Sequence, residues 1–245
     1  MNLLLFESTE LDASGQLSVS GSRLAHLLDV HHKDSGDTVR VGEIGGRLGD
    51  ARIISINRER AVLAPTLHSE PPAKLPLRLV LALPRPKMLR RILRVVAELG
   101  VAELHLIHSY RVEKSYWQTP VLQDAAIRGY LLQGLQQSRD TLLPSVHCHR
   151  RFKPFVEDSL PGLGDGRRAL LAHPGDYAPC PRGVDPRGVG PRGVATPTLL
   201  VVGPEGGFIP YEVEKLIAAG CEPVSLGPRI LRVENAVTAL LGRLF

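Results

Sequence analysis

The stretch VVGPEGGF, residues 201–208, is a short apolar run that ends in three glycines, a proline and a single carboxylate. Glycine is favoured where the backbone turns sharply or approaches another group closely. The stretch therefore predicts a buried strand that leads into either a ligand-binding loop or a structural turn. A Walker A loop is excluded because the chain contains no Gly-Lys pair, and the spacing does not fit a G-x-G-x-x-G dinucleotide loop.

A second stretch, LGPRILRVENAVTALLGRLF at residues 226–245, has a similar design. Gly-Pro ends an apolar run, two arginines flank Ile-Leu, and a carboxylate follows. If both apolar runs are strands of one parallel sheet, the two loops emerge at the same carboxyl edge, where α/β proteins bind ligands. Two glycine-bearing loops at that edge form a pocket of backbone amides and carbonyls, which suits a purine ring.

Strands and helices alternate through the second part of the chain. Strands are expected over 77–83, 103–107, 169–173, 198–203 and 222–226, and helices over 86–99, 119–138 and 211–220, with a last helix capped by Asn235. This alternation predicts an α/β fold in which helices cover both faces of a mostly parallel sheet.

The first part of the chain reads differently, as short strands with glycine turns and one helix around 22–28. The stretch TLHSEPPAKLP, residues 66–76, carries three prolines and suits a linker. We therefore expect two domains, residues 1–72 and 73–245. The first holds 7 Lys/Arg against 10 Asp/Glu, a net charge of −3, and the second 23 against 15, a net charge of +8. Attraction to nucleic acid is expected mainly from the second domain.

Composition limits the class of protein. The chain of 245 residues is 43% hydrophobic, enough for a core, and has no apolar run long enough for a membrane span. Its N-terminus lacks the features of a signal peptide. The three cysteines, Cys148, Cys180 and Cys221, are far apart without a CxxC pair, which favours a reducing cytoplasm over a disulfide framework or a zinc site. The histidines show no metal-binding spacing, so we expect no metal and a cytoplasmic protein.

The expected helix over 86–99 has two distinct faces. Leu89, Ile92, Leu93 and Val96 recur at the spacing of a buried stripe. A second face carries the cations Lys87, Arg90, Arg91 and Arg94. This basic face is either solvated or in contact with the phosphates of a nucleic acid.

The two C-terminal stretches together resemble the paired motifs of the RsmE family of 16S ribosomal RNA methyltransferases. LVVGPEGGF and LGPRILRVENA carry the most specific part of the resemblance. AELGVAELHLIHSYRVEKS at 97–115 resembles the family's E-L-G-V segment with its downstream arginine, here Arg111. LLAHP at 170–174 and LLDVHHKDSGDTVRV at 27–41 resemble the strand before the cofactor loops and the N-terminal domain. The resemblance spans nearly the whole chain.

The resemblance implies a fold and a reaction that the pattern alone does not supply. It implies a SPOUT-type parallel sheet with a C-terminal trefoil knot in residues 73–245, preceded by a small PUA-like RNA-binding β-barrel in residues 1–72. It also implies a homodimer that uses S-adenosylmethionine to methylate N3 of a uridine in 16S ribosomal RNA, as free RNA or within the small ribosomal subunit. Because N3 lies on the Watson–Crick edge, the target base must be unpaired or extruded.

On this basis the site residues fall into three groups. The cofactor group comprises His173, Val202, Gly203, Glu205, Gly206, Leu226, Gly227, Ile230 and Leu231. The RNA-binding group comprises Lys87, Arg90, Arg91, Arg94 and Arg111, and the catalytic pair is Arg232 and Glu234.

Uridine N3 bears a proton and is a poor nucleophile until that proton leaves. A cation beside the uracil oxygens stabilises the anion as it forms, and Arg232 is the candidate. Glu234 either orients Arg232 or accepts the proton; alternatively, the two residues only brace the loop. Glu205 either faces the sulfonium or amino group of the cofactor or accepts backbone N–H groups. His173 either lines the cofactor pocket or makes a structural contact.

Some positions depart from the family pattern. Asn235 stands where the family usually has threonine, Val95 where a lysine is common, and His32 where an arginine is usual. These departures leave one rival reading, a non-catalytic RNA-binding protein on the same fold. A second rival is an α/β enzyme that binds a phosphorylated metabolite in its glycine loops. The repeat PRGVDPRGVGPRGV, residues 181–194, predicts a mobile loop whose arginines either touch RNA or lie on the surface.

Overall fold

The computed structural model describes residues 2–30, 32–182 and 198–245. The chain folds into two compact units, one of Met1–Pro72 with Leu132–Leu143, the other of Ala73–Leu131 with Pro144–Phe245. The first unit ends in the proline-rich stretch, and it also includes 132–143, a segment from the second half of the chain that the expected division at residue 72 does not contain. Apart from its first two residues, the PRGV repeat lies outside the described residues.

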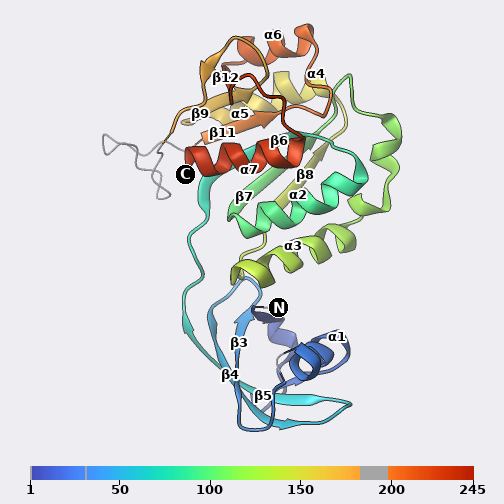
Figure 1. Ribbon diagram of the computed structural model, residues 1–245, viewed down its shortest axis with the longest axis vertical. Coiled ribbons are helices and arrows are strands. Elements are labelled where there is room, and N and C mark those ends of the chain that lie inside the picture. Colours follow the sequence, from blue (N-terminus) through green and yellow to red (C-terminus); the bar gives the residue numbers. More distant parts are fainter. Residues whose placement is uncertain (1, 31, 183–197) are drawn as a thin grey trace. The chain divides into compact units, whose positions relative to one another are not determined.

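The first unit is a curled five-stranded sheet with β1 and β2 as its edges (Figure 1). Its strands are β1 (Leu4–Phe6), β2 (Leu17–Val19), β3 (Thr38–Glu43), β4 (Leu48–Ile56) and β5 (Ala61–Ser69), in the order β1-β3-β4-β5-β2. Only β1 and β3 pair in parallel. The short 3-10 helix η1 (Ser8–Glu10), helix α1 (Gly21–Ala25) and the π-helical turn η2 (His26–Val30) complete the unit, and Leu24 and Leu27 pack into its core.

The second unit contains a seven-stranded sheet in which every pairing is parallel. Its strands are β6 (Leu75–Ala82), β7 (Val101–Ile107), β8 (Ser145–His149), β9 (Arg168–Ala172), β10 (Ala178–Pro179), β11 (Thr198–Val202) and β12 (Glu222–Ser225). The strand order is β10-β12-β9-β11-β6-β7-β8. All five residues of β11 are buried, and this strand pairs with β9 on one side and β6 on the other. The expected parallel α/β sheet is confirmed.

Helices cover this sheet, with α2 and α7 in contact with each other and α5 against β11 (Figure 1). The helices are α2 (Pro86–Glu98), α3 (Asp124–Ser138), α4 (Phe152–Pro154), α5 (Leu160–Gly164), α6 (Pro210–Ala218) and α7 (Val233–Leu244). The part of α3 from Leu132 onward belongs to the first unit. Shorter 3-10 and π segments are η3 (Lys114–Gln118), η4 (Pro120–Leu122) and η5 (Phe155–Ser159). The stripe predicted on the helix over 86–99 is fully buried in α2. Among the described residues, none of the helices has both the length and the apolar character that crossing a bilayer requires.

Some details of the sequence reading were wrong. The helix expected over 119–138 begins only at Asp124, where α3 starts after the separate segment η4. Asn235 does not cap the last helix, because α7 already begins at Val233 and the extended residue before it, Arg232, occupies the N-cap position. Strand β8 was not expected, because its polar residues Ser145, His147 and His149 hide the apolar pattern of a strand.

The central position of β11 leads to a stability prediction. Leu200→Ala should lower the free energy of unfolding by about 2–5 kcal/mol, because Leu200 is fully buried and its removal leaves a cavity. Urea denaturation followed by circular dichroism measures the loss. Leu99→Ala is the control, since Leu99 is 37% exposed at the end of α2 and should change stability far less. Equal losses in the two variants would contradict the central role of β11.

Candidate functional site

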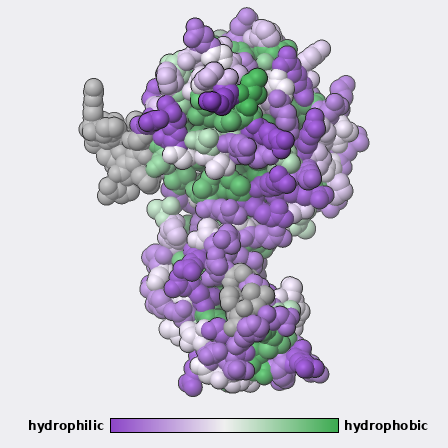
Figure 2. All heavy atoms as spheres, in the orientation of Figure 1, coloured by the Kyte–Doolittle hydropathy of each residue, from purple (hydrophilic) through white to green (hydrophobic). Residues whose placement is uncertain are grey.

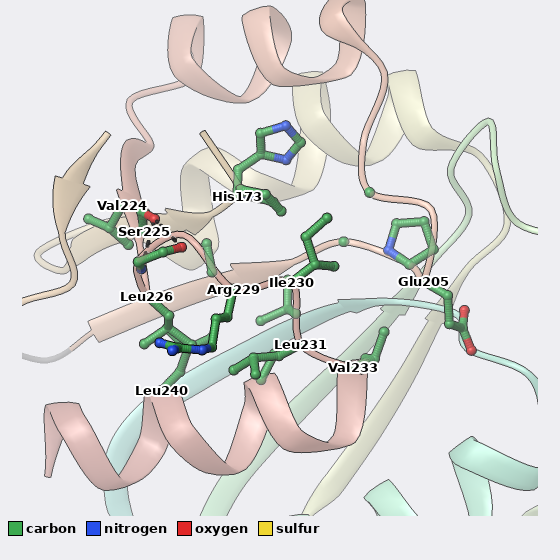
Figure 3. A pocket seen from close by; sticks show the side chains of 18 residues that line it. His173, Glu205, Val224, Ser225, Leu226, Arg229, Ile230, Leu231, Val233 and Leu240 are labelled. Carbon is green, nitrogen blue, oxygen red and sulfur yellow. Dashed lines mark hydrogen bonds between the residues drawn. The ribbon is translucent and has the colours of Figure 1, made fainter. Parts of the chain in front are cut away.

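The carboxyl ends of three neighbouring strands meet at one pocket of the second unit (Figure 3). His173 follows β9, Gly203 follows β11 and Leu226 follows β12. The pocket contains about 650 Å³ of space, part of it open to solvent. Residues Val233, Ala236 and Leu240 of α7 line one side of it. The two glycine loops therefore do emerge at the same sheet edge.

Most residues predicted for the ligand loops line this pocket: His173, Val202, Gly203, Glu205, Leu226, Gly227, Ile230 and Leu231. Gly206 does not line it; the guanidinium of Arg111 donates a hydrogen bond to the Gly206 carbonyl. Sequence reasoning missed several lining residues: Ala172, Pro174, Pro204, Gly207, Val224, Ser225, Arg229, Val233, Ala236 and Leu240. The spacing of Val233, Ala236 and Leu240, all on one face of α7, is a signal that would have identified those three.

Glycine is required in the two loops for different physical reasons, close packing at one position and backbone conformation at others. A Cβ on Gly203 would lie 3.2 Å from the Phe208 ring, so glycine allows this ring to pack against the loop. Gly207 and Gly227 have φ angles of +72° and +104°, which side-chain-bearing residues rarely adopt. Nothing lies within 4 Å of a Cβ built on Gly227. The Cα side of Gly227 is therefore open, while its N–H and C=O both contact the Ser225 hydroxyl.

His173 presents an unsatisfied polar atom at the pocket. Its backbone N–H donates to the Val224 carbonyl oxygen at 3.0 Å, which fixes the residue beside β12. Its Nδ1 is buried and has no hydrogen-bond partner within the described part of the chain. Burial lowers the pKa of His173, and the charge of Arg111 lowers it further. The ring is accordingly neutral at pH 7 and retains hydrogen-bonding capacity for a ligand.

Glu205 connects the first glycine loop to α2. Its Oε1 accepts a hydrogen bond from the backbone N–H of Arg85 at 3.2 Å, immediately before the first residue of the helix. In Figure 3 its carboxylate points away from His173. Two roles were considered for Glu205, and the observed hydrogen bond matches the second, acceptance of a backbone N–H. A carboxylate at a helix N-terminus is also favoured by the helix dipole.

The catalytic pair predicted from sequence is not an ion pair within the described residues. Arg232 is exposed at the N-cap of α7. Glu234 instead faces Arg91 of α2, with 3.9 Å between its Oε1 and the Arg91 Nη1. The other oxygen of Glu234 is buried and lacks a hydrogen-bond partner in the described chain. The described residues show no contact between Glu234 and Arg232, so neither an orienting role nor a bracing role of this pair has support. Glu234 retains one carboxylate oxygen without a hydrogen-bond partner among them.

The basic face of α2 is accessible. Lys87, Arg90 and Arg91 are exposed. Arg94 is half-buried, with its guanidinium 4.9 Å from the centre of the Tyr130 ring and a hydrogen bond to the Arg90 carbonyl oxygen. Glu205, which lines the pocket, and Glu234 of α7 both contact this helix, so the basic face lies next to the elements that line the pocket.

The buried carboxylate of Glu212, only 2% exposed, was not singled out from the sequence. Its Oε1 accepts the Tyr110 N–H at 2.7 Å and its Oε2 accepts the Ile209 N–H at 3.1 Å. The residue thereby connects the N-terminus of α6 to the loop that carries Arg111. Arg111 in turn contacts Gly206, so Glu212 supports the first glycine loop indirectly.

Comparison with known proteins identifies the family. Residues 71–244 match the model of the RNA methyltransferase domain family. The ribosomal RNA small subunit methyltransferase E of Treponema pallidum is 31% identical over 98% of this chain and 88% of its own length. The protein of the same name from Synechocystis is 28% identical over 93% of this chain and 72% of its own length.

The chain belongs to the ribosomal RNA small subunit methyltransferase E family. The protein is accordingly an RNA methyltransferase, and the family resemblance read from the two C-terminal motifs is confirmed. A solved structure of the Neisseria gonorrhoeae family member, described as bound to S-adenosyl methionine, has a TM-score of 0.68 at 20% identity and covers 98% of this chain and 95% of its own. At that identity the likeness shows a shared fold.

The contacts of Glu212 lead to a second stability prediction. Glu212→Ala should lower the free energy of unfolding by about 2 kcal/mol or more, because two buried N–H groups lose their acceptor. Differential scanning calorimetry measures this as a lower melting temperature. Glu214→Ala, at an exposed position of the same helix, is the matched control and should change stability by no more than about 0.5 kcal/mol. A neutral Glu212→Ala variant would refute the supporting role.

Proposed function

We propose that this methyltransferase transfers a methyl group from S-adenosylmethionine to N3 of a uridine in 16S ribosomal RNA. The observation that carries the proposal is the pocket at the carboxyl edge of β9, β11 and β12, which the family-specific loops enclose. Membership of the family supports the reaction and the ribosomal substrate. Such a substrate implies that the enzyme works in the cytoplasm.

The residues of the pocket fit S-adenosylmethionine. Leu226, Ile230, Leu231 and Leu240 offer apolar surface for a purine ring. The unpartnered Nδ1 of His173 offers a polar partner, and the open space at Gly227 offers room for the ligand. When bound, this cofactor supplies a methyl group on a sulfonium centre, an excellent leaving group. The protein's part is to position the two reactants and to make the uridine nitrogen nucleophilic.

Arg232 and Glu234 have complementary parts in that activation. The N3 proton of uridine must leave before the nitrogen can attack. Arg232 is exposed at the start of α7, adjacent to the pocket residues Leu231 and Val233, and its charge stabilises the uracil anion through the uracil oxygens. Glu234, two residues after Arg232, accepts the N3 proton when its carboxylate turns toward the base. Arg91 beside Glu234 compensates its negative charge before the proton arrives.

The RNA lies along the basic face of α2 in this proposal. Lys87, Arg90, Arg91 and Arg94 contact phosphates, and Arg111 extends the contact toward the glycine loop. The exposed target base enters the pocket rim unpaired. Methyl transfer in this scheme uses no metal ion.

Three further features follow from the family and complete the proposal. The strand order β12-β9-β11 is part of a C-terminal trefoil knot. The first unit, with its curled sheet, is a PUA-like domain that binds RNA. The enzyme is a homodimer, and its partner copy covers apolar surface such as Ile230, which is 82% exposed, and Leu231, which is 39% exposed. Apolar surface of this kind is visible on the second unit in Figure 2.

Cofactor binding tests the pocket. Gly227→Ala should weaken binding of S-adenosylmethionine at least tenfold, because a methyl group enters the pocket and the backbone leaves φ = +104°. Isothermal titration calorimetry with S-adenosylmethionine and S-adenosylhomocysteine measures the change.

Gly220→Ala is the matched control for this variant. Gly220 has a φ angle of +94° and open space around it, but it follows α6 and does not line the pocket. Both variants should lose about 1–2 kcal/mol of stability from backbone strain, and only Gly227→Ala should lose affinity. If both variants bind the cofactor like the wild type, the pocket is not the cofactor site.

The methyl transfer assay tests the reaction. Arg232→Ala should lower kcat roughly tenfold or more while the Kd for S-adenosylmethionine stays within about twofold, since Arg232 lies outside the pocket lining. Transfer of labelled methyl groups to 16S ribosomal RNA and small subunits measures kcat, and mass spectrometry of the digested RNA locates the methyl group. Wild-type turnover in this variant would remove Arg232 from the mechanism. Methylation at a position other than uridine N3 would overturn the proposed product.

A further inference from the structure

A cluster of three histidines and a glutamate lies at the edge of the sheet, away from the pocket loops. Glu103 and His105 come from β7, and His147 and His149 come from β8 (Figure 1). Residues two apart on a strand share a face, and the parallel register sets His105 beside His147 and Ile107 beside His149. All four side chains therefore lie on one face of two neighbouring strands.

The potential ligand atoms of this cluster converge. Glu103 Oε1 lies 3.1 Å from His105 Nε2 and 4.0 Å from His147 Nε2. One ligand atom from each of Glu103, His105 and His147 lies within 4.8 Å of the others. Ligands at tetrahedral Zn²⁺ are about 3.4 Å apart, given bond lengths near 2.1 Å. The side chain of His147, 48% exposed, has the freedom to move the remaining distance.

Outer contacts orient two of these ligands. His149 Nε2 lies 3.0 Å from His105 Nδ1, so the Nδ1–H of His105 can donate to it while Nε2 faces the glutamate. Arg78 donates to Glu103 Oε2 at 2.6 Å, which leaves Oε1 directed at the histidines. Phe155 packs against the rings of His105 and His149. Hydrogen-bonded outer partners of this type are typical of metal-ligating histidines.

We propose that Glu103, His105 and His147 bind a divalent transition-metal ion, with Zn²⁺ as the best match, and that His149 and Arg78 orient the ligands. Two imidazoles and one carboxylate leave a fourth position for water. The ion joins the edge strand β8 to β7 and so stabilises the edge of the sheet. The positive charge of Arg78 opposes the ion, which favours micromolar rather than nanomolar affinity.

Titration of the metal-free full-length protein with ZnCl₂ tests the site. Calorimetry should show one ion bound per chain, and CoCl₂ should produce the visible absorption of tetrahedral Co²⁺. His147→Ala should reduce Zn²⁺ affinity at least tenfold and abolish the Co²⁺ bands, and this half-exposed position tolerates truncation. His149→Ala should reduce the affinity roughly tenfold through the orientation of His105.

His68→Ala is the matched control. His68 is an exposed histidine of the first unit whose Nε2 lies 3.1 Å from Asp50. It therefore forms a histidine–carboxylate pair like that of His105 and Glu103, but without a second histidine ligand among the described residues. This variant should bind Zn²⁺ like the wild type. The proposal is overturned if the wild type shows no saturable binding, if His147→Ala binds as tightly as the wild type, or if His68→Ala loses as much affinity as His147→Ala.

Discussion

The backbone of β11 sets the constraint on which the pocket depends. All five of its residues are buried, so water cannot satisfy its N–H and C=O groups, and both neighbouring strands must do so. Pairing with β6 and β9 in parallel, and of β9 with β12, brings the carboxyl ends of β9, β11 and β12 to one edge. The loops that follow these three strands therefore lie at the same edge. The position of the pocket is thus a consequence of hydrogen-bond satisfaction in the sheet.

Carboxylates connect the pocket to its surroundings. Glu205 accepts the N–H at the start of α2, Glu234 faces Arg91 on the same helix, and Glu212 holds the loop of Arg111 against α6. Glu205 thus attaches the basic helix to the first glycine loop, and Glu234 attaches it to α7. In the proposed reaction, these contacts help to orient the basic face of α2 relative to the pocket, and orientation is the protein's main contribution when the cofactor supplies the leaving group.

The sequence was informative wherever a function depends on residues that follow one another. Val202, Gly203 and Glu205 are contiguous with a buried strand, as Leu226 and Gly227 are, and their place in the pocket could be inferred. It was uninformative where partners come from distant segments. Glu234 was expected beside Arg232 but faces Arg91, more than a hundred residues away along the chain. Asn235 was expected as a cap, yet α7 begins two residues earlier, at Val233, and packs against α2.

The sequence by itself determined the alternation of strands and helices, the buried stripe of α2, the two glycine loops and the family. Each of these features depends on the spacing of residues that are close together in the chain. Only the tertiary structure decided which strands are neighbours. This arrangement of strands places the unpartnered Nδ1 of His173 at the pocket. It also buries Glu212, which accepts the backbone N–H of Tyr110. It also set His105 beside His147 across β7 and β8. The physical reason is that strand pairing satisfies backbone groups across any sequence distance, so local spacing does not encode it.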